Sequence, residues 1–134
     1  MMLGAFQSCQ LRLEVNASRS AIRESLTCPE VIQRWLFPQQ LEPGLPKTLT
    51  AGLTYKSQFL GLTIAHEVSA VHEDGLKLLL SGSVEGFHYW YWGEGWVQSH
   101  LEGVSLLPLK LAHSLTLLQL RSFLEGTEGT GSPD

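Results

Sequence analysis

Charged residues are scarce in this sequence, and basic residues do not exceed acidic ones. Only 16% of the 134 residues are charged, and 9 Lys and Arg stand against 13 Asp and Glu, a formal net charge of −4. Proteins that bind nucleic acid carry clustered Lys and Arg, so we expect no nucleic-acid partner. Uncharged apolar runs of about 18 residues are also missing, so we expect no integral membrane association.

Cysteine is equally scarce, and sequence signatures of cofactor sites are absent. Cys9 and Cys28 form no CxxC pair, and no Cys or His spacing matches a zinc site, so we predict no metal. P-loop and dinucleotide fingerprints are missing too, which predicts no cofactor. Residues 1–10 lack the basic and apolar regions of a signal peptide, and two thiols suit a reducing compartment, so we expect a cytoplasmic protein.

The sequence does contain enough apolar residues for a packed core. Hydrophobic residues make up 43% of the chain, and a chain of this length buries about two-thirds of its unfolded surface. We therefore predict one domain over residues 1–124. Residues 125–134 read EGTEGTGSPD, and this mixture of Gly, Ser, Thr, Pro and acidic residues predicts a flexible C-terminal tail.

Hydrophobic periodicity predicts an α+β protein. Alternation with a period of two favours about six strands, and turn signals such as Glu73-Asp74-Gly75 and Gly93-Glu94-Gly95 favour antiparallel pairing. The predicted strands are residues 9–15, 53–59, 64–70, 76–86, 87–92 and 97–102, and the predicted helices are residues 18–27, 29–37 and 108–124. Two short helices thus follow the first strand, and one long helix ends the domain.

The long helix is apolar on nearly every side. One stripe consists of Leu107, Leu111, Leu115 and Leu118, and a second consists of Leu109, Ala112, Leu120 and Phe123. A helix of this kind must be covered on more than one side. The second stripe could face a cavity or a second copy of the chain, so a homodimer is an alternative use of this helix.

Three segments share their pattern with a known family. They are residues 15–36 (VNASRSAIRESLTCPEVIQRWL), the strand, turn and strand of residues 68–80, and the helix that starts near Pro108. Together they resemble the START-like superfamily (SRPBCC, or helix-grip), and within it the small polyketide cyclase/dehydrase-like proteins. The resemblance implies a curved antiparallel sheet wrapped on the C-terminal helix, with a cavity for an apolar ligand between them. Members include enzymes, carriers of lipids, sterols or quinones, and chaperone activators, and they share no catalytic signature.

Several polar side chains fall on the inward phase of the predicted strands. His66 could serve there as a general acid or base, or as a hydrogen-bonded structural residue. Tyr55, Ser57 and Ser99 could orient the polar atoms of a ligand or bond the backbone. By the resemblance Trp35 caps one end of the cavity, although it could also be a core anchor. The predicted ligand-binding residues are Trp35, Tyr55, Ser57, His66, Ser99, Leu111, Leu115 and Leu118.

Aromatic residues concentrate in residues 87–96, FHYWYWGEGW. Alternation places Phe87, Tyr89 and Tyr91 on one face of the strand and His88, Trp90 and Trp92 on the other. These rings could form core packing, a cavity wall or a partner interface. The nearby acids offer no catalytic partner, because they fall on outward phases or turns, and a Ser-His-acid triad cannot be assembled. These acids are Glu67, Glu85, Glu94 and Glu102.

These observations predict a module that binds a small apolar ligand, such as a lipid, isoprenoid, quinone or pigment, between the sheet and the C-terminal helix. One alternative is a cyclase- or dehydratase-like enzyme, with His66 as acid or base and Tyr55 or Ser99 orienting a substrate carbonyl. Another is a non-enzymatic protein-interaction domain with a filled interior. We favour binding over catalysis because few ionisable groups face inward. A pocket of roughly 300 Å³ or more would support the first two hypotheses over the third.

Overall fold

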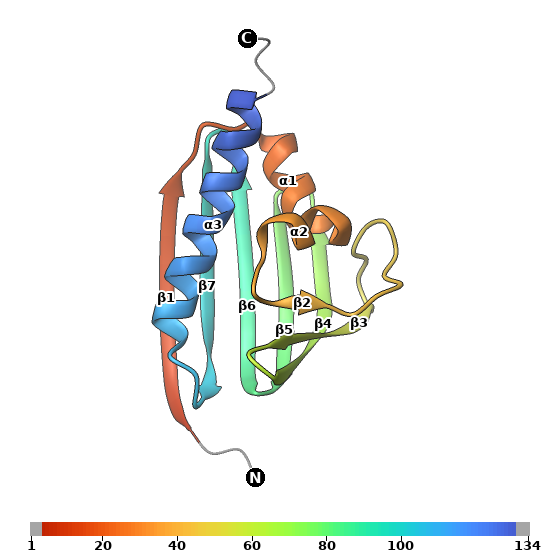
Figure 1. Ribbon diagram of the computed structural model, residues 1–134, viewed down its shortest axis with the longest axis vertical. Coiled ribbons are helices and arrows are strands. Elements are labelled where there is room, and N and C mark those ends of the chain that lie inside the picture. The colour runs from red at the N-terminus through yellow and green to blue at the C-terminus, as the bar shows by residue number, and fades with distance from the viewer. Residues whose placement is uncertain (1–3, 131–134) are drawn as a thin grey trace.

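A curved sheet and one long helix dominate the molecule (Figure 1). The computed structural model describes residues 4–130, and in that range the strands form one antiparallel sheet of seven, ordered β1-β7-β6-β5-β4-β3-β2. The elements are β1 (Ala5–Glu14), α1 (Arg19–Thr27), α2 (Pro29–Trp35), β2 (Gln40–Leu41), β3 (Thr54–Phe59), β4 (Leu62–His72), β5 (Gly75–Gly82), β6 (Val84–Gly93), β7 (Trp96–Ser105) and α3 (Leu109–Thr130).

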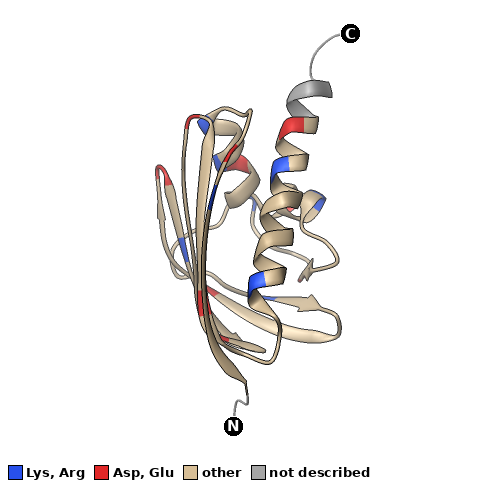
Figure 2. Cartoon of the chain, turned by 90° about the vertical axis from the view of Figure 1, so that its left-hand side faces the viewer, with Lys and Arg blue, Asp and Glu red and all other residues tan. Residues whose placement is uncertain are grey.

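The predicted α+β class is confirmed, including the two short helices after the first strand. Figure 2 shows the sheet on edge, with α3 lying along one side of it. The periodicity misses β2, a strand of 2 residues that pairs with β3. A strand this short shows no alternation, and it lies in a connection that contains Pro38, Pro43 and Pro46.

Local capping sets the boundaries of α1 and α2. The Ser18 hydroxyl accepts a hydrogen bond from the Ala21 amide at 3.1 Å, as an N-cap residue does. α1 then buries Ile22 and Leu26 on one side. Pro29 opens α2, where its missing N–H breaks no helical hydrogen bond. Local sequence therefore accounts for where these two short helices begin.

The hairpins follow the predicted turn chemistry. His72 pairs with Gly75 across the β4–β5 turn, and Gly93 pairs with Trp96 across the β6–β7 turn. Gly95 has a φ of 79°, a left-handed conformation that glycine adopts without steric cost. Each turn sets the register of the two strands that it joins, although the register of β4 against β5 shifts between Val68 and Ala70.

Gln7 of β1 fixes the start of α3. Its side-chain oxygen accepts a hydrogen bond from the Leu109 amide at 2.9 Å, and its amide nitrogen donates to the Leu107 carbonyl at 2.8 Å. The predicted C-terminal end of the helix at Leu124 is wrong, because α3 continues to Thr130. Helix extension from a formed turn outweighs the weak local preference of this segment. The predicted tail therefore overlaps the helix, and its remainder, residues 131–134, lies outside the described residues.

The structure also corrects which stripe of α3 faces inward. Leu109 and Leu120 of the second stripe are 3% and 0% exposed, whereas Leu111, Leu115 and Leu118 of the first stripe are 60%, 52% and 45% exposed. The second stripe is thus the packed one, and the stripe assigned to the ligand lies on the outer side or at its border. α3 carries leucines on every side, so its sequence alone does not identify the side that faces the sheet.

α3 lies against one end of the sheet. Its backbone approaches β1 and β7, and α1 and α2 also contact it. Within residues 4–130 no helix combines the length and hydropathy that crossing a bilayer requires.

Candidate functional site

A cavity of about 340 Å³ lies between the sheet and the three helices. Its floor comes from the inward faces of β3 to β7, and its walls come from α1, α2, α3 and the segment after α2. Most of the lining is apolar, including Trp35, Trp90 and Leu78. This volume lies in the range of pockets that enclose small molecules.

The mouth of the cavity lies between α3 and the segment that follows α2. Phe37 and Leu115 both line the cavity, yet they are 62% and 52% exposed. Gln119 connects the two sides, because its side-chain amide donates a hydrogen bond to the Phe37 carbonyl. One hydrogen bond and two exposed apolar side chains therefore lie at this edge of the cavity.

The polar groups of the cavity are uncharged side chains. Among the described lining residues none is Asp, Glu, Lys or Arg. Those that carry polar atoms beyond the indole of tryptophan are Gln39, Tyr55, His66, His88, His113, Thr116 and Gln119. These side chains can form hydrogen bonds with a ligand. The described lining has no charged side chain that could pair with a charged ligand.

His66 ends a short hydrogen-bond chain. The Gln39 amide nitrogen donates to the Ser57 hydroxyl at 2.7 Å, and that hydroxyl lies 2.9 Å from His66 Nε2. The amide nitrogen cannot accept a proton, so the hydroxyl proton is directed to His66 Nε2. The neutral ring then carries its own proton on Nδ1, for which residues 4–130 provide no acceptor.

His88 and His113 share one serine. Ser99 Oγ lies 2.7 Å from His88 Nε2 and 2.8 Å from His113 Nε2. The hydroxyl has a single proton, so it donates to one imidazole and accepts Nε2–H from the other. The two rings therefore take opposite tautomers when both bonds are satisfied. Ser99 is fully buried, which keeps water from replacing either bond.

Burial keeps these imidazoles neutral. Desolvation lowers the pKa of His66 from 6.5 to about 4, and desolvation with a smaller contribution from His100 lowers the pKa of His113 to about 4. Desolvation also lowers the pKa of His88 well below its usual value, and the neighbouring histidines add to this effect. A low-dielectric site disfavours the charged form of each ring.

Tyr55 and His66 form a stacked pair on β3 and β4. Their ring centroids are 4.6 Å apart, and the planes differ by 5°. Burial raises the pKa of the Tyr55 hydroxyl, so it stays protonated at neutral pH. The pair presents two flat neutral rings to the cavity.

The structure brings together half of the predicted ligand-binding residues. Trp35, Tyr55, His66 and Leu115 line the cavity. Ser57 and Ser99 are not described as lining residues, but their hydroxyls hydrogen-bond the histidines that are. Leu111 and Leu118 are not among the described lining residues, which follows from the corrected phase of α3.

Sequence reasoning missed His88 and His113 as cavity residues. His88 shares its face with Trp90 and Trp92, which are buried, so the inward phase of β6 was available from the alternation. His113 lies among leucines on α3, and no sequence signal connects it with Ser99 on β7. The opposite face of β6 carries Phe87, Tyr89 and Tyr91, which are only partly buried.

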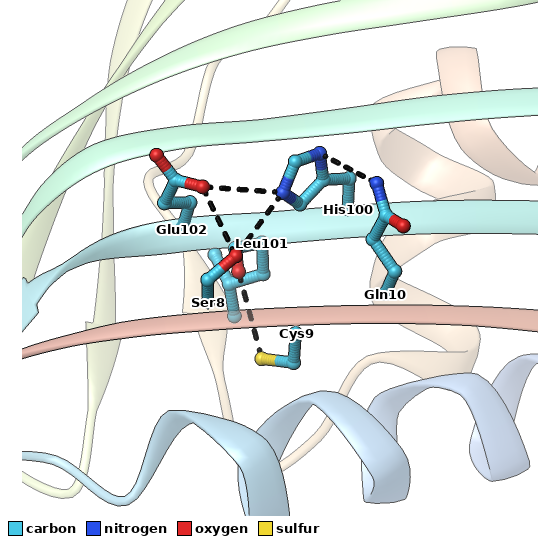
Figure 3. Close-up of polar contacts among 6 residues, drawn as sticks. All are labelled: Ser8, Cys9, Gln10, His100, Leu101 and Glu102. Atoms are coloured by element: carbon cyan, nitrogen blue, oxygen red, sulfur yellow. Dashed lines mark hydrogen bonds and ion pairs between the residues drawn. The ribbon is translucent and has the colours of Figure 1, made fainter.

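A second serine and histidine cluster lies on the outer face of β1 and β7 (Figure 3). Ser8 Oγ lies 3.4 Å from His100 Nε2 and donates to Glu102 Oε1 at 3.0 Å. Glu102 also lies 3.3 Å from His100 Nε2, while Gln10 lies 3.1 Å from Nδ1. Serine and acid thus meet the same imidazole nitrogen. A nucleophilic triad needs them on opposite nitrogens, so this cluster is not one.

The described residues include no group of three His, Cys, Asp or Glu side chains that could hold a metal ion. Cys9 is buried, Cys28 is half-buried, and both are free thiols.

Comparison with known proteins identifies the fold only through solved structures. No family model matches the sequence, and no curated protein matches it. Protein CV1439 from Chromobacterium violaceum superposes with a TM-score of 0.73 at 15% identity, over 95% of this chain and 98% of that one. The Aha1 dimer from Colwellia psychrerythraea gives 0.62 at 18% identity, over 89% and 96%. DynU16, from the dynemicin biosynthetic locus, gives 0.67 at 18% identity, over 88% of this chain and 47% of that one. The chain therefore has the helix-grip fold.

Proposed function

We propose that the protein binds a small, mainly apolar molecule in the cavity between the sheet and α3. The observation that carries this proposal is the cavity itself, which has a volume of about 340 Å³ and an apolar lining. A filled interior would have favoured a protein-interaction role. The ligand classes that fit are lipid, isoprenoid, quinone and pigment-like molecules, because burial of apolar surface supplies most of the binding free energy.

Catalysis through His66 is the second candidate, because Tyr55 stacks beside it in a ligand-sized cavity. DynU16, a fold neighbour, comes from a biosynthetic locus. A pKa of about 4 makes His66 a weak base at neutral pH, since a general base works best when its pKa is close to the working pH. We therefore favour binding over catalysis.

We further propose that the chain is a START-like protein of the cytoplasm, in keeping with its fold and its free thiols. Self-association, where it occurs, is assigned to the exposed side of α3 with Leu111, Leu115 and Leu118 rather than to the packed stripe. Aha1 of Colwellia psychrerythraea, a fold neighbour, was solved as a dimer.

Native mass spectrometry of the purified protein tests ligand and oligomeric state together. We expect a mass excess of a few hundred daltons that disappears on denaturation. The matched variants are Ala112→Phe, which fills the cavity from α3, and Leu111→Phe, which adds the same ring to the exposed side. Ala112→Phe should abolish the excess, and Leu111→Phe should keep it.

Titration with the uncharged fluorophore N-phenyl-1-naphthylamine provides the second measurement. The wild type and Leu111→Phe should bind it, and Ala112→Phe should bind at least about tenfold more weakly. Circular dichroism shows whether each variant is folded. Equal binding by both variants, or no binding by the folded wild type, would overturn the proposal.

A further inference from the structure

Of the seven described polar side chains that line the cavity, tryptophan aside, three carry imidazoles. His66, His88 and His113 all line it, and we call them the imidazole face. They come from β4, β6 and α3, so the sheet and the helix both contribute. The lining residues described by the structure include no charged side chain, so these rings share the polar contacts for a ligand with the uncharged side chains of Gln39, Tyr55, Thr116 and Gln119.

Hydrogen bonds within the protein fix these rings as neutral groups. Gln39 and Ser57 direct a proton toward His66 Nε2, which leaves the His66 proton on Nδ1. Ser99 bonds both other rings through their Nε2 atoms, so each of those needs only one proton. A second proton on the ring that accepts from Ser99 would remove the acceptor that the hydroxyl requires.

A charged ligand would be poorly matched to this face. A carboxylate or an ammonium group loses its hydration when it enters, and no described side chain of the lining supplies the opposite charge. A hydroxyl or carbonyl loses less hydration and can exchange its hydrogen bonds with water for bonds to neutral imidazoles. His66 Nδ1 and His113 Nδ1 are buried and have no partner among the described residues, so a ligand acceptor that reaches one of them would satisfy it.

We infer that the ligand is an uncharged amphiphile, with an apolar body and a hydroxyl or carbonyl group that contacts the imidazole face. The inference rests on the proposed function and narrows it. It separates this cavity from one that holds fatty acids or amines through an ion pair.

Four probes with the same alkyl chain test the head group. Decan-1-ol, decan-2-one, decanoate and decylammonium are titrated at pH 7 against bound N-phenyl-1-naphthylamine. We expect the alcohol and the ketone to displace the fluorophore with similar affinity. The two ions should bind at least about tenfold more weakly, a difference of about 1.4 kcal/mol. Equal displacement by all four overturns the inference but leaves the proposed function standing.

If the fluorophore fails to bind and none of the four probes protects the protein against thermal unfolding, the proposed function itself fails. The two failures are therefore distinguishable in one set of titrations.

Two variants that each introduce a lysine test whether the head group of the probe reaches the cavity lining. Thr116→Lys places an ammonium group at the cavity lining, and Leu118→Lys places one on the exposed side of the same helix. Thr116→Lys should improve decanoate binding at least about tenfold relative to decan-1-ol. Leu118→Lys should leave the ratio unchanged. Equal ratios in both folded variants would show that the head group does not reach the lining, against the inference.

A last variant tests the polar contact directly. His66→Phe keeps a flat ring against Tyr55 but removes Nδ1–H. It should weaken decan-2-one about three- to tenfold and leave N-phenyl-1-naphthylamine within about twofold, the loss being that of one neutral hydrogen bond. An unchanged affinity for decan-2-one in the folded variant would remove His66 from the proposed contact.

Discussion

The two faces of the sheet carry serine and histidine in opposite surroundings. On the inner face Ser99 hydrogen-bonds His88 and His113, which line the cavity. Ser99 and His113 are almost completely buried. On the outer face Ser8 lies beside His100, with Glu102 within ion-pair distance and solvent around the cluster. The surroundings therefore decide what each pair can do: the inner imidazoles are held neutral, and the outer one has a carboxylate beside it.

The same contrast runs along α3. Leu117 and Leu118 are neighbours in sequence, yet the first is fully buried and the second is 45% exposed. Packing against β1, β7 and α1 selects one side of a helix whose composition is nearly uniform. Position relative to the sheet, rather than residue type, thus separates structural leucines from surface ones.

Acidification should produce the largest effect. In the unfolded chain His66 and His113 take up protons around pH 6.5, whereas in the folded protein they do so near pH 4. The unfolded state therefore binds more protons as the pH falls through this window. The contribution of these two rings to the free energy of unfolding should be fully present above about pH 6.5. It should decline toward pH 4, by up to about 3 kcal/mol for each ring. Urea unfolding at several pH values measures this.

Two variants assign the acid effect to the inner face. His113→Gln removes one buried titrating ring and should flatten the decline between pH 6.5 and 4. His100→Gln, on the outer face, removes only the smaller contribution to the lowered pKa of His113, so it should change the profile less than His113→Gln does. Equal profiles for both variants would show that the inner imidazoles are not the cause.

Truncation of the two leucines should give the next largest difference. Leu117→Ala should lower the free energy of unfolding by about 2–5 kcal/mol, because it removes buried methyl groups and leaves a void. Leu118→Ala should cost less than about 1 kcal/mol, since the side chain is already half in water. Equilibrium urea unfolding compares them, and similar losses would contradict the orientation of α3.

Removal of the serine hydroxyls should give the smallest difference. Ser99→Ala leaves two imidazole nitrogens without their partner and should cost about 1–3 kcal/mol. Ser8→Ala should stay within about 0.5 kcal/mol, because water replaces its bonds. Thermal unfolding of the two variants beside the wild type measures this, and a neutral Ser99→Ala would count against the shared hydrogen bonds.

Much of the fold could be predicted from the sequence because strands have a strict period. The alternation in residues 64–70 places His66 inward, and it does the same for Tyr55 and Ser99 on their strands; the structure buries all three. The turns after His72 and Gly93 could be read from their Asp and Gly residues. β2 could not be predicted, since a strand of 2 residues is too short to show alternation.

The candidate site was less accessible to sequence reasoning because it depends on contacts between distant elements. His113 reaches Ser99 only once α3 lies on β7, and neither residue signals the other in the sequence. The inward side of α3 was missed for a related reason, since a helix with leucine on every side can be rotated without changing its apparent match. Tertiary packing fixes both.

The order of the sheet has a consequence for how the chain is made. β1 pairs with β7 along its whole length, from Ala5 with Ser105 to Glu14 with Trp96. A chain emerging from a ribosome therefore exposes β1 without this strand partner until β7 has been synthesised. Pairing between such distant segments is slow, because a long loop must close before any contact forms. The sheet is thus completed only after β7 has emerged, and until then its first strand offers an open edge to chaperones and to other nascent chains.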